Sequence, residues 1–201
     1  MANRNTSGFG LIPVGTIGST PATGGQGKYY IDAADDADLF QGSAVQSKVG
    51  YIKTAQAAIT NTCIGVLNGI FYNAATTLKP TWANWYNQPI TPANSEDLTA
   101  FVMDNPFQLF VGSLDAAAAQ AVYGYTVGLT VTAAGSELSG QSSSTLTETT
   151  KNATNNQWRL IRSAEDPEND QNAAYRSVVV AHNLNQYLQN ISTTPAGITW
   201  Q

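Results

Sequence analysis

The stretch YTVGLTVT, residues 125–132, decides the fold class of this chain. Its large apolar side chains fall on every second position, and threonine or glycine fills the positions between them. A period of two places one set of side chains on each face of an extended strand. The stretch therefore predicts a β-strand with one apolar face.

Similar segments lie on both sides of this stretch. The segments CIGVLNGIF (63–71), LTAFV (98–102), FQLFV (107–111), WRLI (158–161) and SVVVAH (177–182) predict further strands, and Asn68-Gly69 and Asp104-Asn105-Pro106 predict turns. Only SLDAAAAQAVYG (113–124) favours a helix, with Ser113 as the N-cap and Gly124 as the stop. The pattern predicts a mainly β protein: a compact β-barrel or β-sandwich with one short helix and an extended N-terminal arm.

The chain divides into three parts. In residues 1–28, glycines and prolines interrupt the apolar residues too often for a helix or a long strand. We expect this arm to lie along its own body or on a neighbouring subunit. Residues 29–189 are predicted to form the β body, and residues 190–201 a polar tail. Within the body, residues 79–94 predict a long loop with two tryptophans and three prolines.

Composition limits the class of partner. The chain has 201 residues, a formal net charge of −5 and 11% charged residues, against roughly 25% in an average domain. Such a chain has no long-range attraction for phosphate, so we expect neither nucleic acid nor a membrane surface as its partner. The only cysteine, Cys63, excludes an intrachain disulfide and is predicted to be a small buried hydrophobe. No signal peptide or membrane-spanning run is predicted.

A hydroxyl-rich stretch, residues 135–157, raises the question of a serine nucleophile. A nucleophile elbow needs G-x-S-x-G, but GQSSS (140–144) ends in serine. A serine nucleophile also needs a base, and the only histidine, His182, shares a strand face with Val180. We interpret the stretch as a surface loop or irregular edge and His182 as a half-buried strand residue, and we predict no catalytic residue.

Metal and cofactor sites are not predicted either. Two acidic clusters are present, Asp32, Asp35, Asp36 and Asp38, and Glu165, Asp166, Glu168 and Asp170. Neither matches an EF-hand loop, so we interpret both as solvated loops, with a cation site as the alternative. One cysteine and one histidine cannot form a usual zinc site. The Gly24-Gly25-Gln26-Gly27 run lacks the lysine pattern of a phosphate-binding loop.

Two groups of apolar residues are predicted to form contacts with a capsid or another subunit. The arm contributes Phe9, Leu11, Ile12, Pro13 and Val14, and the loop contributes Trp82, Trp85 and Tyr86. The loop carries no charge between Lys79 and Glu96. Interface cores are depleted in charge and enriched in aromatic residues, which favours a protein contact. Stacking of these aromatic rings on a sugar is the alternative.

The order of the motifs resembles a family of tailed-bacteriophage virion proteins. GFGLIPV (8–14), YYI (29–31) and DLFQGSAV (38–45) are similar to its F-G-L-x-P-V arm and its Y-Y-I and L-F-x-G-D-x-V segments. ITNTCIGVLNGIF (59–71), VMDNPFQLFVGSLD (102–115), SGQSSSTL (139–146) and SVVVAHNLNQYL (177–188) follow in the family's order. The chain departs from the family at Ser43, where the family has Asp, and at Asn185, where it has His.

The resemblance implies a head decoration, or cement, protein on the outer surface of a virion assembled in the host cytoplasm. Its expected partners are the major capsid protein and further copies of itself, as a homotrimer or a dimer. Two rival functions are a carbohydrate-binding module on a virion surface and a tail or tube subunit.

Overall fold

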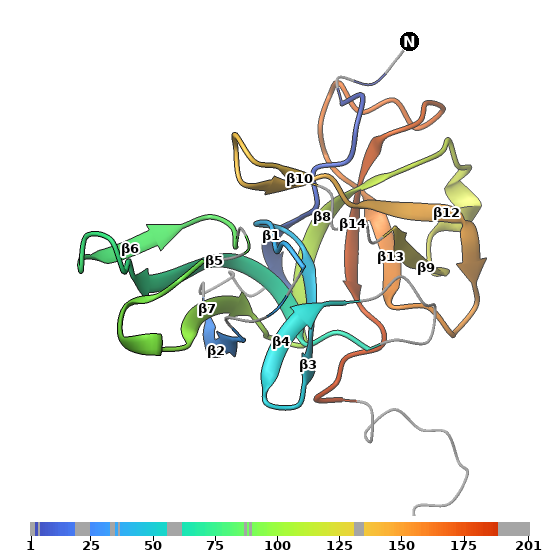
Figure 1. The fold of residues 1–201 in the computed structure, drawn as a ribbon. Helices are drawn as coiled ribbons and strands as arrows, with labels where there is room; N and C mark the ends of the chain where they lie inside the picture. The colour runs from blue at the N-terminus through green and yellow to red at the C-terminus, as the bar shows by residue number, and fades with distance from the viewer. Residues whose placement is uncertain are drawn as a thin grey trace, which may run out of the picture.

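A computed structural model describes residue 3 and residues 5–18, 25–32, 35, 37–55, 62–86, 88, 90–130 and 135–188. The expected tail at 190–201 lies outside the described residues, as do Gly24, Asp36 and the last two residues of the stretch 125–132. The described chain is mainly β, as the sequence predicts, and its strands form two lobes that lie side by side (Figure 1).

The first lobe is a closed β-barrel. Its strands follow the order β8-β12-β9-β13-β14, and β14 pairs back onto β8 to close the ring. The strands are β8 (Gln108–Leu114), β9 (Thr126–Thr130), β12 (Thr145–Asn152), β13 (Trp158–Ser163) and β14 (Arg176–His182).

The N-terminal arm contributes one more strand to the barrel wall. β1 (Leu11–Thr16) pairs antiparallel with β8, with Leu11 opposite Gly112 and Thr16 opposite Gln108. On the same edge of β8, Leu114 pairs with Leu146 of β12, while β14 occupies the other edge. β1 and β12 therefore share one edge of β8 end to end, and the arm lies along the body of its own chain.

The second lobe is a twisted sheet in the order β2-β7-β5-β3-β4, with β6 paired to the far half of β5. Its strands are β2 (Gly27–Ile31), β3 (Ala44–Lys48), β4 (Tyr51–Thr54), β5 (Gly65–Asn73), β6 (Pro80–Ala83) and β7 (Leu98–Met103). β7 alternates strictly: Leu98, Ala100 and Val102 are buried, and the residues between them are partly exposed. One face of this sheet is therefore core, and part of the other face meets solvent.

Three short elements complete the described fold. β10 (Gly135–Ser136) and β11 (Gln141–Ser142) form a small hairpin, and two 3₁₀ turns cover Ala93–Ser95 and Gln120–Val122.

Each lobe has an apolar core, and the barrel core extends into the second lobe. Phe110, Trp158 and Val180 pack inside the barrel together with Ala44 and Val66 from the second sheet. A separate cluster around Ile31, Leu67 and Leu98 fills the second sheet. Because the barrel core takes residues from both sheets, the two lobes are joined by buried apolar contacts.

The helix expected at 113–124 is wrong. Ser113 and Leu114 are the last residues of β8 and pair with Ser177 and Arg176, and only Gln120–Val122 make a 3₁₀ turn. The alanine run has high helix propensity, but a helix this short is marginal without tertiary packing, and strand pairing occupies the two residues where it would begin.

Two segments expected as loops contain strands. Most of the hydroxyl-rich stretch forms β12, a wall of the barrel, and the β10–β11 hairpin. The start of the tryptophan loop forms β6, which pairs with β5. The turn expected at Asn68-Gly69 is instead a bulge inside β5, because the register with β7 shifts between Leu67 and Gly69.

Candidate functional site

The serines of the hydroxyl-rich stretch have structural contacts. Ser142 is buried, and its hydroxyl donates to Ser144 Oγ at 2.9 Å, while the Ser144 N–H donates to Ser142 Oγ at 3.2 Å. These bonds form a local hydroxyl turn at the end of β11. No hydrogen bond to a base is present at Ser142 among the described residues, so the arrangement needed to activate a nucleophile is not formed there.

The contact between Cys63 and His182 brings a thiol and an imidazole together, the residue types of a cysteine nucleophile and its base. The thiol sulfur lies 3.4 Å from His182 Nδ1. The imidazole ring packs against Trp158 and Phe110, with centroid distances of 4.5 and 5.5 Å. Although His182 as a residue is half-buried, its Nε2 is enclosed and has no hydrogen-bond partner among the described residues.

Burial keeps both groups neutral. It raises the pKa of the Cys63 thiol to about 12 and lowers the pKa of His182 to about 3. An activated cysteine needs the opposite shifts, a thiolate beside a protonated imidazole, in a partly exposed site. The contact therefore joins residue 63 to the end of β14, and Cys63 is the buried small side chain that the sequence predicts.

The acidic clusters do not converge on a metal site within the described ranges. No group of three or more Cys, His, Asp or Glu side chains in those ranges is placed to hold an ion. Asp35 is buried and pairs with Lys53 Nζ at 3.4 Å, and Glu165 pairs with Arg162 at the surface.

The eight predicted contact residues fall into two groups. Leu11 and Tyr86 are 1% and 0% exposed and belong to the interior of this chain, not to a contact surface. Leu11 enters the barrel core because the inward face of β1 packs beside β8, and the Tyr86 hydroxyl donates to the Asp35 carbonyl at 3.1 Å. The other six residues reach the surface fully or in part.

Trp85 makes a contact within the chain. Its ring stacks on Phe40 with centroids 5.1 Å apart and planes 8° apart. A side chain at Gly140 would lie 2.8 Å from the Trp85 ring, and one at Gly135 would overlap Phe40. The aromatic pair therefore packs against the β10–β11 hairpin and holds it to the second lobe.

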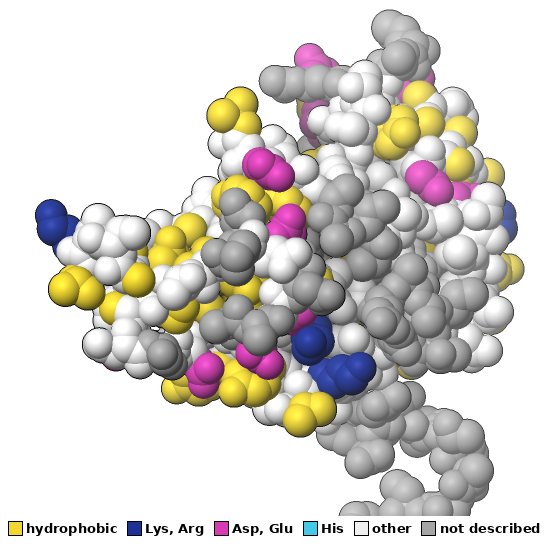
Figure 2. Space-filling model, viewed as in Figure 1, with side chains coloured by type: hydrophobic (Ala, Val, Ile, Leu, Met, Phe, Trp, Pro, Cys, Tyr) yellow, Lys and Arg dark blue, Asp and Glu magenta, His cyan; other side chains and the backbone are white. Residues whose placement is uncertain are grey.

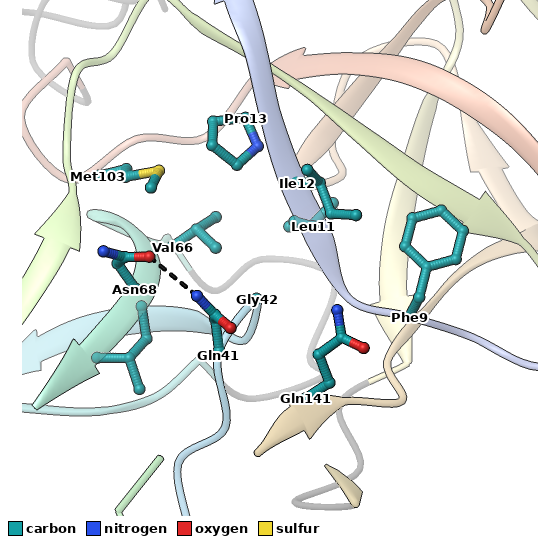
Figure 3. Close-up of a pocket in the computed structure, with 11 residues that line it drawn as sticks. Phe9, Leu11, Ile12, Pro13, Gln41, Gly42, Val66, Asn68, Met103 and Gln141 are labelled. Carbon is teal, nitrogen blue, oxygen red and sulfur yellow. Dashed lines mark hydrogen bonds between the residues drawn. The ribbon is translucent and has the colours of Figure 1, made fainter. Parts of the chain in front are cut away.

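A groove lies where β1 meets the second sheet (Figure 3). Phe9, Ile12 and Pro13 form one wall, and Val66 of β5 and Met103 of β7 form the other. The cavity measures about 160 Å³. The amides of Gln41, Asn68 and Gln141 also line the groove, and no charged side chain among the described residues does.

Close backbone packing fixes the floor of the groove. Leu11 N–H donates to the Gly42 carbonyl at 2.9 Å. Gly10 and Gly42 both have positive φ, and a side chain on Gly10 would lie 2.8 Å from the Gly42 oxygen. Glycine is required at Gly10 because the left-handed conformation and the near contact both exclude a Cβ.

Beside the groove, the outward face of β1 is apolar and exposed. Ile12 is 43% and Val14 50% exposed, and Ile17 and Phe107 are exposed at the end of the strand. The Ile17 N–H donates to the Phe107 carbonyl at 2.9 Å, which holds these two residues together. We call these four residues and the groove the arm surface.

A row of aromatic residues crosses the outer face of the second sheet. Strand register places Tyr30 opposite Thr99, Thr99 opposite Phe71, and Phe71 opposite Trp82. Trp82 is 48% exposed, lies over Gly69 and packs against Phe101 at a centroid distance of 5.2 Å. Figure 2 shows hydrophobic side chains gathered on the lobe that carries β5, β6 and β7.

Sequence reasoning found Trp82 but not its neighbours Tyr30 and Phe71. The alternation of KYYI, GIFYN and PTWA places each of these aromatic residues on one face of its strand. Their alignment in one row depends on the pairing of Tyr30 and of Phe71 with Thr99, which lies 69 and 28 residues away in sequence, and a single sequence does not specify that register.

Comparison with known proteins identifies no relative of this chain. No protein-family model, curated protein or solved structure matches this chain. In the part of the chain that the structure describes, no helix is long and apolar enough to cross a membrane. The arm surface and the aromatic row are therefore the two candidate docking surfaces of this chain.

Proposed function

We propose that this chain is a bacteriophage virion structural protein, a decoration protein that binds the outside of the head and links neighbouring capsomers. The observation that supports this function best is the arm surface. It combines exposed Ile12, Val14, Ile17 and Phe107 with a neutral groove on a rigid β framework. Exposed apolar patches of this kind mark protein interaction sites, and the resemblance in motif order supports a virion partner.

The framework suits a structural role. The barrel is closed by β14 on β8, so its wall has no long free edge, and both lobes share buried apolar contacts. The Cys63–His182 contact is neutral and enclosed, and Ser142 and Ser144 hydrogen-bond to each other in a local turn. A protein that stabilises a shell needs a stable body and a docking surface, and repeated weak contacts on a symmetric shell add up to firm attachment.

The test is binding to shells assembled from the major capsid protein of the same genome. The native chain should co-sediment with the shells, and an Ile12→Asp, Val14→Asp double variant should lose at least tenfold in affinity. Val49→Asp is the matched control, because Val49 is exposed in the β3–β4 turn, away from the arm surface. Failure of the native chain to bind shells, or equal binding by the double variant, would argue against this function.

Self-association belongs to the same proposal. We expect a homotrimer or a dimer, which size-exclusion chromatography with light scattering separates from a monomer and from a large ring. A ring or an open polymer would favour the tail or tube subunit.

A second candidate function, glycan binding, is favoured by the aromatic row. Tyr30, Phe71 and Trp82 present exposed rings on one sheet face, and rings of this kind stack on sugars. Trp85 and Tyr86 do not join them, because one is stacked on Phe40 and the other is buried. Binding to a glycan array that disappears in Trp82→Ala would support this function, and background signal for the native chain would exclude it.

A further inference from the structure

We propose that the groove of the arm surface binds one apolar side chain, of about leucine or phenylalanine size, carried by an extended segment of the partner protein. The amides of Gln41, Asn68 and Gln141 would hold the main chain of that segment. This inference rests on the proposed docking function and names the chemistry of the contact.

The volume of the groove sets the size of the side chain. At about 160 Å³, it is close to the ~150 Å³ apolar cavity that accepts a benzene molecule. Ile12 of β1 and Met103 of β7 supply apolar side chains to its walls, and the buried Leu11 and Val66 lie beneath them. One branched aliphatic or aromatic side chain fills such a space, whereas alanine leaves most of it empty.

The amides of Gln41 and Asn68 are held in place, with hydrogen-bonding capacity to spare. Gln41 donates its backbone N–H to the Gly140 carbonyl at 2.9 Å, and its carbonyl accepts from the Ser142 N–H at 2.9 Å. Its side-chain Nε2 donates to Asn68 Oδ1 at 3.1 Å, the dashed line in Figure 3. An amide pair of this kind still offers a donor on Asn68 and an acceptor on Gln41.

This remaining donor and acceptor match a peptide group. Each peptide group presents one N–H and one C=O, and a side-chain amide can pair with both. Gln141 pairs with Gln41 in a parallel bridge, and Figure 3 draws its amide beside that of Gln41, on the side nearer Phe9. A segment that crosses the groove therefore meets a row of amides beside the inserted side chain.

The uncharged lining of the groove disfavours a charged side chain as its occupant. The groove is lined by apolar and amide groups alone, so a carboxylate or ammonium group entering it would lose its hydration without an ionic partner. Val14 lies two residues after Ile12 on β1 and is also exposed. It provides an apolar surface for the residues that flank the inserted side chain. The occupant is thus a neutral, extended protein segment with one large apolar residue.

The test uses blocked single amino acids as probes, followed by NMR of the full chain. N-acetyl-leucinamide and N-acetyl-phenylalaninamide each carry one apolar side chain between two peptide groups. We expect saturable shifts of the Met103 methyl signal and of the Gln41 and Asn68 side-chain amide signals, with a dissociation constant on the order of 1 mM. N-acetyl-alaninamide and the aspartic acid equivalent should bind at least tenfold more weakly.

Two variants at exposed isoleucines provide the matched comparison. Ile12→Trp fills the groove from its rim and should lower the affinity for N-acetyl-leucinamide at least tenfold. Ile17→Trp adds the same ring at an exposed position that does not line the groove, and should leave probe binding unchanged. Gln141→Met should weaken the binding of the blocked amino acids but not the binding of benzene, which has no peptide group.

The outcomes separate this inference from the proposed function. If the probes bind as expected but shells do not bind the native chain, the groove is a side-chain site and the decoration function is wrong. If shells bind and Ile12→Trp binds them as well as Ile17→Trp, with no saturable probe shifts, the docking function stands and the groove proposal is wrong. Equal affinity for the alanine, aspartate and leucine probes would also overturn it.

Discussion

Lowering the pH should destabilise this protein through its one histidine. Burial lowers the pKa of His182 from the ordinary 6.5 to about 3, so the folded chain keeps the ring neutral where the unfolded chain protonates it. This contribution to stability is full above pH 6.5 and is lost as the pH falls toward 3. One pKa unit corresponds to about 1.4 kcal/mol. Between pH 7 and pH 5 the free energy of unfolding should therefore fall by about 2 kcal/mol from His182 alone.

Urea denaturation of the native chain and of His182→Phe, each at pH 7 and pH 5, measures this effect. The variant keeps an aromatic ring against Trp158 and Phe110 but does not titrate. With a urea slope of about 2 kcal/mol per molar, the native midpoint should fall about 1 M further than the variant's over this pH range. Carboxylates titrate equally in both proteins, so the difference reports the histidine. The same pH dependence in both would show that the ring is solvated in the folded chain and would refute the reasoning.

Three further predictions concern packing. Cys63→Ala should lower the free energy of unfolding by about 1 kcal/mol or somewhat more, and a bulky maleimide should label the native thiol only as fast as the protein unfolds; rapid labelling would contradict burial. Trp85→Ala should cost about 2 kcal/mol and speed amide hydrogen exchange in residues 135–142, because the ring packs on Phe40 and that hairpin; unchanged exchange there would count against this contact. Leu11→Ala should cost about 2–5 kcal/mol in urea denaturation, whereas Ile12→Ala should change stability by no more than about 0.5 kcal/mol; equal costs would mean that β1 is not seated as described.

The β class of the fold follows from local pattern, and the arrangement of its strands does not. The alternation in LTAFV and the apolar runs of SVVVAH and CIGVLNGIF identify strands, because the period of two is a property of each segment alone. The alanine run after Leu114 also has a clear local preference, for helix, but pairing with β14 holds Ser113 and Leu114, where that helix would begin, in a strand. The hydroxyl-rich β12 is missed because its large apolar residue Leu146 is surrounded by Thr and Ser.

In the candidate site, too, the sequence predicts the residue types but not their arrangement. The sequence identifies Ile12, Val14 and Trp82 as apolar residues without an evident partner, and the structure leaves all three exposed. It cannot separate them from Leu11 or Tyr86, because burial of these two depends on β8 and Asp35, distant in sequence. The amides of the groove carry no local signal at all: Gln41, Asn68 and Gln141 meet only when both lobes are folded.

The shared edge of β8 has a consequence for the order in which the chain is completed during synthesis. β8, the partner of β1, is made about a hundred residues after β1. At ordinary translation rates of about 5–20 residues per second, this delay is roughly 5–20 s. Until then Leu11, Ile12 and Val14 have no strand to pair with, and the ring cannot close before β14 is made. β1 therefore waits longer for its partner than any other strand described here, and its apolar residues favour aggregation when nascent chains are crowded.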